Sequence, residues 1–147
     1  MPAVLRERLS TIANEAQVAS RAGGDADVLL RSLLASIPFA ALVADNHGLY
    51  VAANAAASVL TGYSAPELRR LSVWQLTPMG DYHDAETLWR AFLARGEQSG
   101  SYVLVAKDGQ RLTVDYAARA HVLPQRHLSL LKLRPSTFGD AVVAADR

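Results

Sequence analysis

The side chains best suited to hold a small molecule in this chain are aromatic: Trp74, Trp89, Tyr102 and Tyr116. Aromatic walls with one or two polar groups are the usual lining of a ligand or cofactor site. Each tyrosine adds a hydroxyl group, and a buried hydroxyl must find a hydrogen-bond partner. On adjacent antiparallel strands, both tyrosines would point into one cavity. The competing interpretation is that these rings simply fill the core, because large aromatic side chains serve packing first.

Catalytic motifs are absent from the sequence. There is no Gly-x-Ser-x-Gly, no phosphate-binding glycine loop and no His-Glu-x-x-His. There is also no cysteine, which excludes disulfides, thiolate metal ligands and cysteine nucleophiles. A small cone-shaped isomerase of the α+β class would pair Asp115 with Tyr116, but neighbours on a strand point to opposite faces. Asp115 is expected in solvent, and we predict that the protein is not an enzyme.

The histidines do not complete a metal site. His47 lies in a turn and is expected at the surface. His121 and His127 flank another turn, but two further ligands are missing, and we predict no metal. His83 opens a long predicted helix and stays a candidate for ligand binding.

Two helices are expected at the N-terminus. Residues 2–21 place leucine, isoleucine and alanine on one stripe, which is the pattern of a helix with one apolar face. The stripe has few large residues, so this helix must pack on something. After a glycine pair, Asp25 or Asp27 caps a second helix, which ends at Pro38.

Strands and short helices are predicted beyond Pro38. The expected strands are 39–44, 49–53, 99–106, 111–122 and 127–134. The expected helices are 54–60, 65–71 and 84–94, with an irregular turn or one helical turn at 74–79. In 111–122 the expected inner face is Leu112, Val114, Tyr116, Ala118, Ala120 and Val122. This period of two indicates a half-buried antiparallel strand.

The stretch 45–68 has the most informative order of turn and cap residues. It opens with Asp-Asn-His-Gly, which are turn residues of a hairpin. Asn54 is a good N-cap for an alanine-rich helix, and Gly62 can take the left-handed conformation that closes it. Ser64 and Glu67 have the spacing of a capping box.

This order resembles the first half of a PAS domain, a small intracellular sensor and dimerisation module. The family runs hairpin, Asn, short helix, Gly-Tyr-Ser and Glu-Leu, matched here by Asn54, Gly62-Tyr63-Ser64 and Glu67-Leu68. Lys107-Asp108-Gly109 resembles the family's turn between two long strands, and the resemblance covers 33–133. It implies an α+β PAS fold: a five-stranded antiparallel sheet with short helices on one face and an N-terminal helical extension on the other.

The resemblance also implies a sensory or regulatory domain of bacterial-type signal transduction, which binds a small ligand or a signalling partner protein. The ligand would lie between the sheet and the long helix. Candidate ligand-binding residues are Trp74, His83, Trp89, Tyr102, Leu104 and Tyr116. A ligand-free interaction module, with its core filled by aromatic rings, is the alternative.

The resemblance leaves the cofactor open. Haem-binding members hold the iron with a His on the long helix, and counting back from Gly96 places that position at Ala85, two residues from His83. The Arg that contacts the bound oxygen would fall at Gly100. Light-sensing flavin members need a Cys, which is missing, although other flavin-binding members use a Trp-bearing pocket. Haem and flavin sensors are therefore the lesser alternatives.

Three segments are predicted: an amphipathic helical extension over 1–31, a PAS domain over 32–134 and a flexible tail over 135–147. Members that drive kinases end their last strand with Arg-Asp-aliphatic-Thr before a coiled coil. Here the strand ends Lys132-Leu133-Arg134-Pro135. A signal is therefore expected to leave through the N-terminal helices.

A homodimer is predicted from the pattern of the last strands. Tyr102 and Leu104 are expected to face the cavity together with Leu130. Exposed aliphatic side chains on the other face would need a cover, which residues 2–37 of a dimer supply. Packing within a monomer is the competing version. The expected outer face consists of Val103, Val105 and Leu131.

Composition sets the remaining limits. The 147 residues favour one domain, and half of them are hydrophobic. The net charge is +1 with no concentrated basic face, so no nucleic-acid partner is expected. No apolar run approaches the roughly 20 residues of a membrane span, and charged residues interrupt any signal-peptide core. We expect a cytoplasmic protein without a membrane partner.

Overall fold

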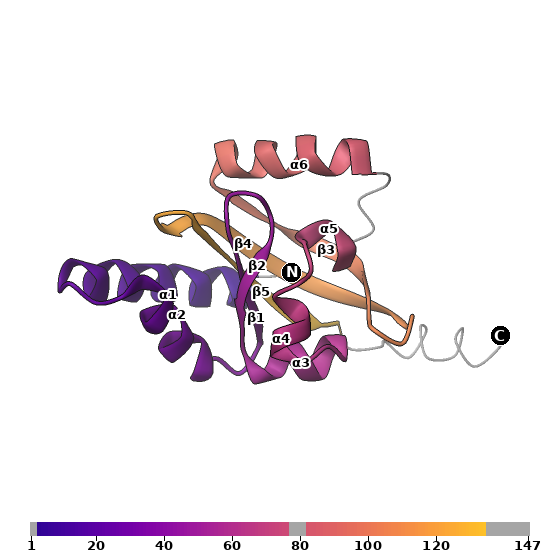
Figure 1. The fold of residues 1–147 in the computed structure, drawn as a ribbon, viewed down its shortest axis with the longest axis horizontal. Coiled ribbons are helices and arrows are strands. Elements are labelled where there is room, and N and C mark those ends of the chain that lie inside the picture. Colours follow the sequence, from indigo (N-terminus) through magenta and orange to yellow (C-terminus); the bar gives the residue numbers. More distant parts are fainter. Residues whose placement is uncertain (1–2, 77–81, 135–147) are drawn as a thin grey trace.

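Five strands form one antiparallel sheet in the computed structural model, which describes residues 3–76 and 82–134. The order across the sheet is β2-β1-β5-β4-β3, so the last three strands complete a sheet that the first two begin (Figure 1). The predicted five-stranded antiparallel sheet is therefore confirmed. Its strands are β1 (Ala40–Ala44), β2 (Tyr50–Ala53), β3 (Glu97–Val105), β4 (Arg111–Leu123) and β5 (Arg126–Leu133).

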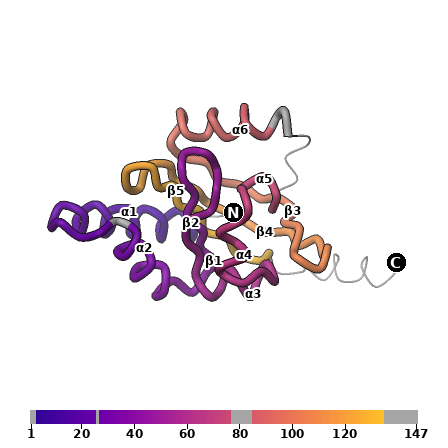
Figure 2. The backbone as a smooth tube through the Cα atoms, viewed as in Figure 1, coloured from indigo at the N-terminus to yellow at the C-terminus, as the bar shows by residue number. Residues whose placement is uncertain are grey.

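The helices of the described ranges fall into two groups. They are α1 (Ala3–Arg21), α2 (Ala26–Ala35), α3 (Ala55–Thr61), α4 (Ala65–Leu68), α5 (Val73–Leu76) and α6 (Tyr82–Arg95). The first two precede the sheet, and the other four connect β2 to β3. Both views place α6 at the top and the α1–α2 pair at the lower left (Figures 1 and 2). The predicted C-terminal tail, 135–147, lies outside the described residues.

The predicted caps are present. The Asp25 side chain accepts hydrogen bonds from two backbone N–H groups at the start of α2. Gly62 ends α3 at a φ of 80°, a left-handed conformation that most side chains disfavour. Ser64 and Glu67 form a reciprocal capping box, which starts α4. Gly62 and the capping box therefore end one helix and begin the next between β2 and α6.

Asn54 does more than cap α3. Its Oδ1 accepts from the backbone N–H groups of Ala57 and Ala41, at 3.0 Å each. Its Nδ2 donates to the carbonyl oxygens of Leu34 at 3.1 Å and Phe39 at 2.9 Å. The side chain is only 8% exposed. One buried amide therefore ties α2, β1 and α3 together and satisfies backbone groups that water cannot reach.

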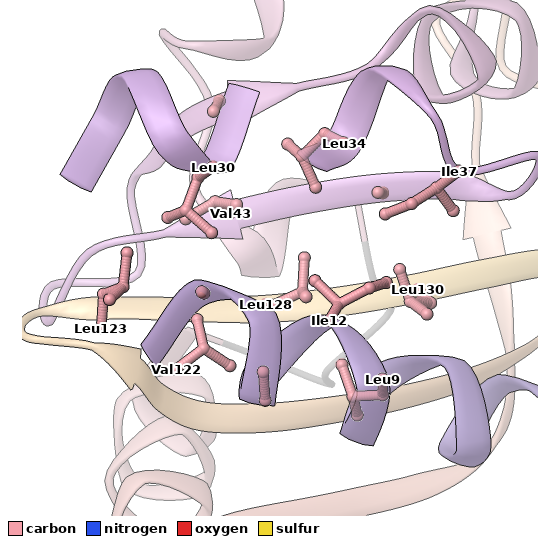
Figure 3. Close-up of a cluster of buried hydrophobic side chains, with 14 of the residues drawn as sticks. Leu9, Ile12, Leu30, Leu34, Ile37, Val43, Val122, Leu123, Leu128 and Leu130 are labelled. Atoms are coloured by element: carbon pink, nitrogen blue, oxygen red, sulfur yellow. The ribbon is translucent and has the colours of Figure 1, made fainter. Parts of the chain in front are cut away.

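The outer face of the sheet is covered by α1 and α2. Leu5, Leu9 and Ile12 of α1 are buried in one cluster with Leu128 and Leu130 of β5, seen in part in Figure 3. This apolar packing stabilises a helix whose isolated stripe would be marginal. The remaining buried members come from α1, α2, β1, β2, β4 and the link between α2 and β1: Ala13, Ala16, Leu30, Leu34, Ile37, Ala41, Val43, Ala52, Ala117, Val122 and Leu123.

The inner face carries a second buried cluster, which includes Trp89 and Phe92 of α6 and Leu104 of β3. The ring centroids of Trp89 and Phe92 are 5.3 Å apart. This cluster and the outer one share the sheet as their common wall, because successive side chains of a strand point to opposite faces. The sheet thus separates α6 from the N-terminal helices.

Three predicted orientations are wrong. Leu131 belongs to the inner cluster and Leu130 to the outer one, because β5 pairs Leu131 with Tyr116 of β4. Val122 lies in the outer cluster, since the register shifts between Arg119 and Leu123 and so breaks the alternation. Across such a bulge, every second residue of the strand no longer lies on the same face of the sheet, so the sequence pattern misassigns Val122.

Asp115 also departs from its prediction. Its Oδ1 accepts a hydrogen bond from Arg134 at 2.8 Å, and its side chain is 17% exposed. It is therefore a partly buried ion-pair partner and not a solvated group. The Arg134 that follows β5 supplies the counter-charge, a pairing between residues too distant in sequence to predict.

Candidate ligand-binding site

A cavity of about 330 Å³ lies between the inner face of the sheet and α6. Trp89 and Phe92 of α6 form its helical wall, and Tyr102 and Tyr116 lie on the sheet side. Its volume falls near the lower end of the range for small-molecule sites. The other lining residues are Ala44, Tyr50, Val73, Leu88, Ala91, Arg95, Gln98, Ser101, Ala118, His127, Leu128 and Ser129.

Tyr102 and Tyr116 meet as the strand pattern predicts. Tyr116 pairs with Gly100 across the β3–β4 ladder, so the tyrosines are diagonal neighbours with ring centroids 5.1 Å apart. The Tyr116 ring lies beside Gly100, where an added Cβ would meet its Cε1 at 3.6 Å, an ordinary van der Waals contact. Burial raises the pKa of both tyrosines, so both hydroxyls are protonated at neutral pH.

Tyr50 is a third tyrosine in this cavity that the sequence pattern did not single out. It comes from β2, at the opposite edge of the sheet from Tyr102 of β3. Its side chain is 4% exposed, and burial raises its pKa above the usual value. Its hydroxyl makes no hydrogen bond to any residue in the described part of the chain. A donor without a partner on the wall of a cavity is suited to bind a polar group of a ligand.

His127 lines the cavity and is hydrogen-bonded to Asn46, which lies outside the lining. The backbone N–H of His121 donates to His127 Nδ1 at 2.9 Å, so the proton of the neutral ring is on Nε2. That Nε2 donates to Asn46 Oδ1 at 2.7 Å. The carbonyl oxygen of Asn46 also accepts from Trp89 Nε1 at 2.9 Å. The turn between β1 and β2 is thus joined to both β5 and α6.

The environment of His127 favours the neutral ring. Its pKa is lowered to about 4, mainly by burial and then by the neighbouring His121 and Arg126, while Asp45 acts in the opposite direction. The ring is 2% exposed and lies edge-on to His121 with centroids 4.7 Å apart. The sequence placed these two histidines only at the ends of a turn, and the structure brings their rings into contact.

The remaining predicted site residues do not all line this cavity. Trp74 does not line this cavity: it packs against Gly48 and borders a smaller one beside Asn46, His47 and Arg90. Leu104 is fully buried in the inner cluster and does not line the cavity. Trp89 borders both cavities.

The haem positions carry no iron ligand in the described residues. Ala85, where the helix ligand would fall, is 1% exposed and has only a methyl side chain. Gly100 lies on β3, opposite Tyr116. His83 falls within α6, but its side chain lies outside the described residues. Neither Ala85 nor Gly100 can serve a haem, so these two positions do not fit that cofactor.

The comparisons with known proteins agree with this fold. The family model for the PAS fold matches residues 29–131. A domain of a sensory box sensor histidine kinase/response regulator from Geobacter sulfurreducens is 22% identical, with a TM-score of 0.62 over 72% of this chain and 92% of that one. The PAS domain of an HTR-like protein from Haloarcula marismortui is 20% identical, with a TM-score of 0.61 over 74% and 91%. No curated protein matches the sequence.

The chain belongs to the PAS family, since the family model covers most of its length. PAS sensory domains of this kind occur in sensor kinases and regulators, and they are typically non-catalytic. A third similar structure is the PAS domain of a LuxR-family transcriptional regulator from Burkholderia thailandensis in complex with ethanol. It is 12% identical, with a TM-score of 0.56 over 69% of this chain and 94% of that one. No helix among the described residues is long and apolar enough to cross a membrane.

Proposed function

We propose that this PAS domain is a sensor that binds a small molecule in the cavity between α6 and the sheet. The observation that carries the proposal is Tyr50, a residue only 4% exposed that lines the cavity and whose hydroxyl makes no hydrogen bond to a described residue. A bound polar group would satisfy it at little cost in ordering, because the ring is already held by packing. Trp89, Phe92 and Tyr116 supply apolar area for the rest of the ligand.

Signal transfer is proposed to run through β5 to the N-terminal helices. His127 of β5 faces the cavity, and the next residue, Leu128, packs under α1 and α2 on the other face. Arg126 donates from Nε to Asp27 Oδ1 at 2.8 Å and from Nη2 to Oδ2 at 3.2 Å, which ties β5 to α2. A ligand that moved His127 would therefore act on α2 through adjacent residues. Occupancy would shift an existing equilibrium of helix packing.

A cavity-filling variant tests the binding site. Ala118 lines the cavity from β4, whereas Thr113 of the same strand is exposed. Benzyl alcohol, which has an apolar ring and one hydroxyl, is titrated into the ¹⁵N-labelled protein. We expect amide shifts around Tyr50 and in α2, abolished by Ala118→Phe and kept by Thr113→Phe. Unchanged binding in Ala118→Phe contradicts the site, and absent binding in the native protein favours the ligand-free interaction module.

We further propose a homodimer formed through the outer surfaces of the N-terminal helices. The buried stripe of α1 is already used within the chain, so a dimer needs the other side. There Val4 and Val18 are 57% and 64% exposed, and Val28 of α2 is 60% exposed. Val4 and Val18 are separated by about four helical turns and so lie on roughly the same side. Exposed aliphatic residues on one surface are typical of an interaction site.

Sedimentation velocity tests the dimer. We expect Val18→Lys to shift the protein toward monomer, and Val59→Lys, at an 84% exposed position on α3, to leave the dimer intact. A clean monomer of the unaltered chain at high micromolar concentration rules the dimer out.

A further inference from the structure

The cavity has one permanent charge on its wall. Of the described residues that line it, Arg95 alone is permanently charged, and none is a carboxylate. The side chain of Arg95, an exposed residue, makes no hydrogen bond or ion pair with any described residue. Nearby Glu97 is already engaged with Arg119 at 3.2 Å. An unpaired guanidinium at the edge of an apolar cavity suits an anion, because it offers several N–H donors in one plane.

The other polar groups at this edge also favour a ligand that accepts hydrogen bonds. The side chains of Gln98 and Arg95 both lie close enough to the Tyr116 phenol to favour its ionised form. Burial nevertheless keeps Tyr116 protonated, so its hydroxyl remains a donor. Tyr102 lies beside it and is protonated for the same reason. A cationic ligand would meet an unpaired positive charge here without any carboxylate.

The apolar part of the wall sets the shape of the ligand. Phe92 and Trp89 lie three and six residues before Arg95 on α6, with their rings tilted by 45° to each other. A flat apolar body can lie against these rings while its charged group reaches the guanidinium. The volume of about 330 Å³ suits a molecule with one ring and a short side chain.

We propose that the cavity selects small monocarboxylic acids with an apolar, ring-sized body, and that Arg95 binds the carboxylate. This inference rests on the proposed ligand-binding function and adds the chemical class of the ligand. Arg95 also has a purely structural explanation, since a cation in the last turn of α6 interacts favourably with the helix dipole. The test must therefore separate an effect on ligand affinity from an effect on folding.

Three ligands of nearly the same shape provide that test: phenylacetate, phenylacetamide and phenethylamine, which are anionic, neutral and cationic. Affinities are measured by isothermal titration calorimetry and amide shifts on the full chain. Phenylacetate is expected to bind about three- to tenfold more tightly than the amide, as for a partly exposed charge pair, and the amine least. Higher salt should reduce the preference for the anion.

Arg95→Gln should remove the preference for phenylacetate and leave phenylacetamide binding unchanged, while Arg95→Lys should keep part of it. Arg90→Gln is the matched control, because Arg90 lies on the same helix, pairs with Glu86 and does not line this cavity. Its affinity for phenylacetate should stay within twofold or so of the native value. Equal losses in both glutamine variants overturn the assignment to Arg95.

Two further outcomes separate this inference from the function on which it rests. If the amide or the amine binds as tightly as the carboxylate, the ligand class is wrong but the cavity still binds small molecules. If none of the three binds at about 10 mM, where even weak ligands register, the carboxylate proposal is overturned. The benzyl alcohol titration then decides separately whether the cavity binds small molecules at all.

Discussion

Acidification should destabilise this protein through one residue, His127. The ring is buried, its Nδ1 accepts the backbone N–H of His121 and its Nε2 donates to Asn46. Protonation would add a hydrogen to Nδ1, which would then face the His121 N–H instead of accepting from it. It would also leave a positive charge in an apolar cavity wall. The pKa of His127 is therefore lowered from 6.5 to about 4 in the folded protein.

The direction in which the free energy of unfolding changes with pH follows from proton binding. As the pH falls below 6.5, the unfolded chain takes up a proton at this ring and the folded chain does not. The free energy of unfolding therefore decreases from 6.5 down to about 4 and becomes constant below that, as far as this residue is concerned. Between about pH 7.5 and pH 5 the loss is about 2 kcal/mol, and the full shift corresponds to about 3 kcal/mol.

Urea denaturation at several pH values, followed by tryptophan fluorescence, measures this loss. His127→Gln keeps a donor for Asn46 but cannot titrate, so its stability should change less between these pH values. The difference between the native protein and the variant cancels other titrating groups, including Asp27, whose pKa is lowered by Arg126. His47→Gln serves as control, because it removes an exposed histidine from the nearby hairpin turn.

Parallel pH profiles for the native protein and His127→Gln would refute the reasoning. An NMR titration gives an independent check, because the imidazole nitrogens should report a neutral ring with its proton on Nε2 at pH 6 or so. A His127 that titrates near its ordinary pKa would show that the ring is more hydrated than its 2% exposure indicates.

Two further predictions concern stability and use urea denaturation with matched controls. Asn54→Ala should cost about 3 kcal/mol, because it leaves buried backbone groups without partners, whereas Ser64→Ala at an exposed cap should cost about 1 kcal/mol; equal costs would contradict the bracing role of the amide. Gly48 and Gly109 both have a left-handed φ, of 80° and 86°, but an added Cβ meets Trp74 at 2.7 Å only at Gly48. Gly109→Ala should cost about 1 kcal/mol and Gly48→Ala at least about twice that, with a shifted Trp74 emission; equal costs and unchanged emission would show that the indole moves freely.

Short-range chemistry made much of the fold predictable. Asp25, Asn54 and Gly62 act within one helical turn, so their side chains and conformations can be interpreted from sequence spacing alone. The alternation along β4 holds from Leu112 to Ala120 for the same reason. It fails at Val122, where the change of register depends on how β5 pairs with β4.

The candidate site was less predictable, because its residues come from strands at opposite edges of the sheet. Tyr102 and Tyr116 were found because neighbouring strands bring them together. Tyr50 was missed, since nothing near it in the sequence shows that β2 ends up across the cavity from β3. His127 was missed for a related reason: its burial and its partner Asn46 are both decided by long-range packing.

The sequence by itself therefore determined the elements, their caps and the family, because hydrogen bonds and periodicity within a few residues decide these. The tertiary structure alone decided which of Leu130 and Leu131 faces inward, that the stripe of α1 packs on its own sheet, and which polar groups meet in the cavity. The physical reason is that desolvation, unlike capping, depends on every segment that closes over a group.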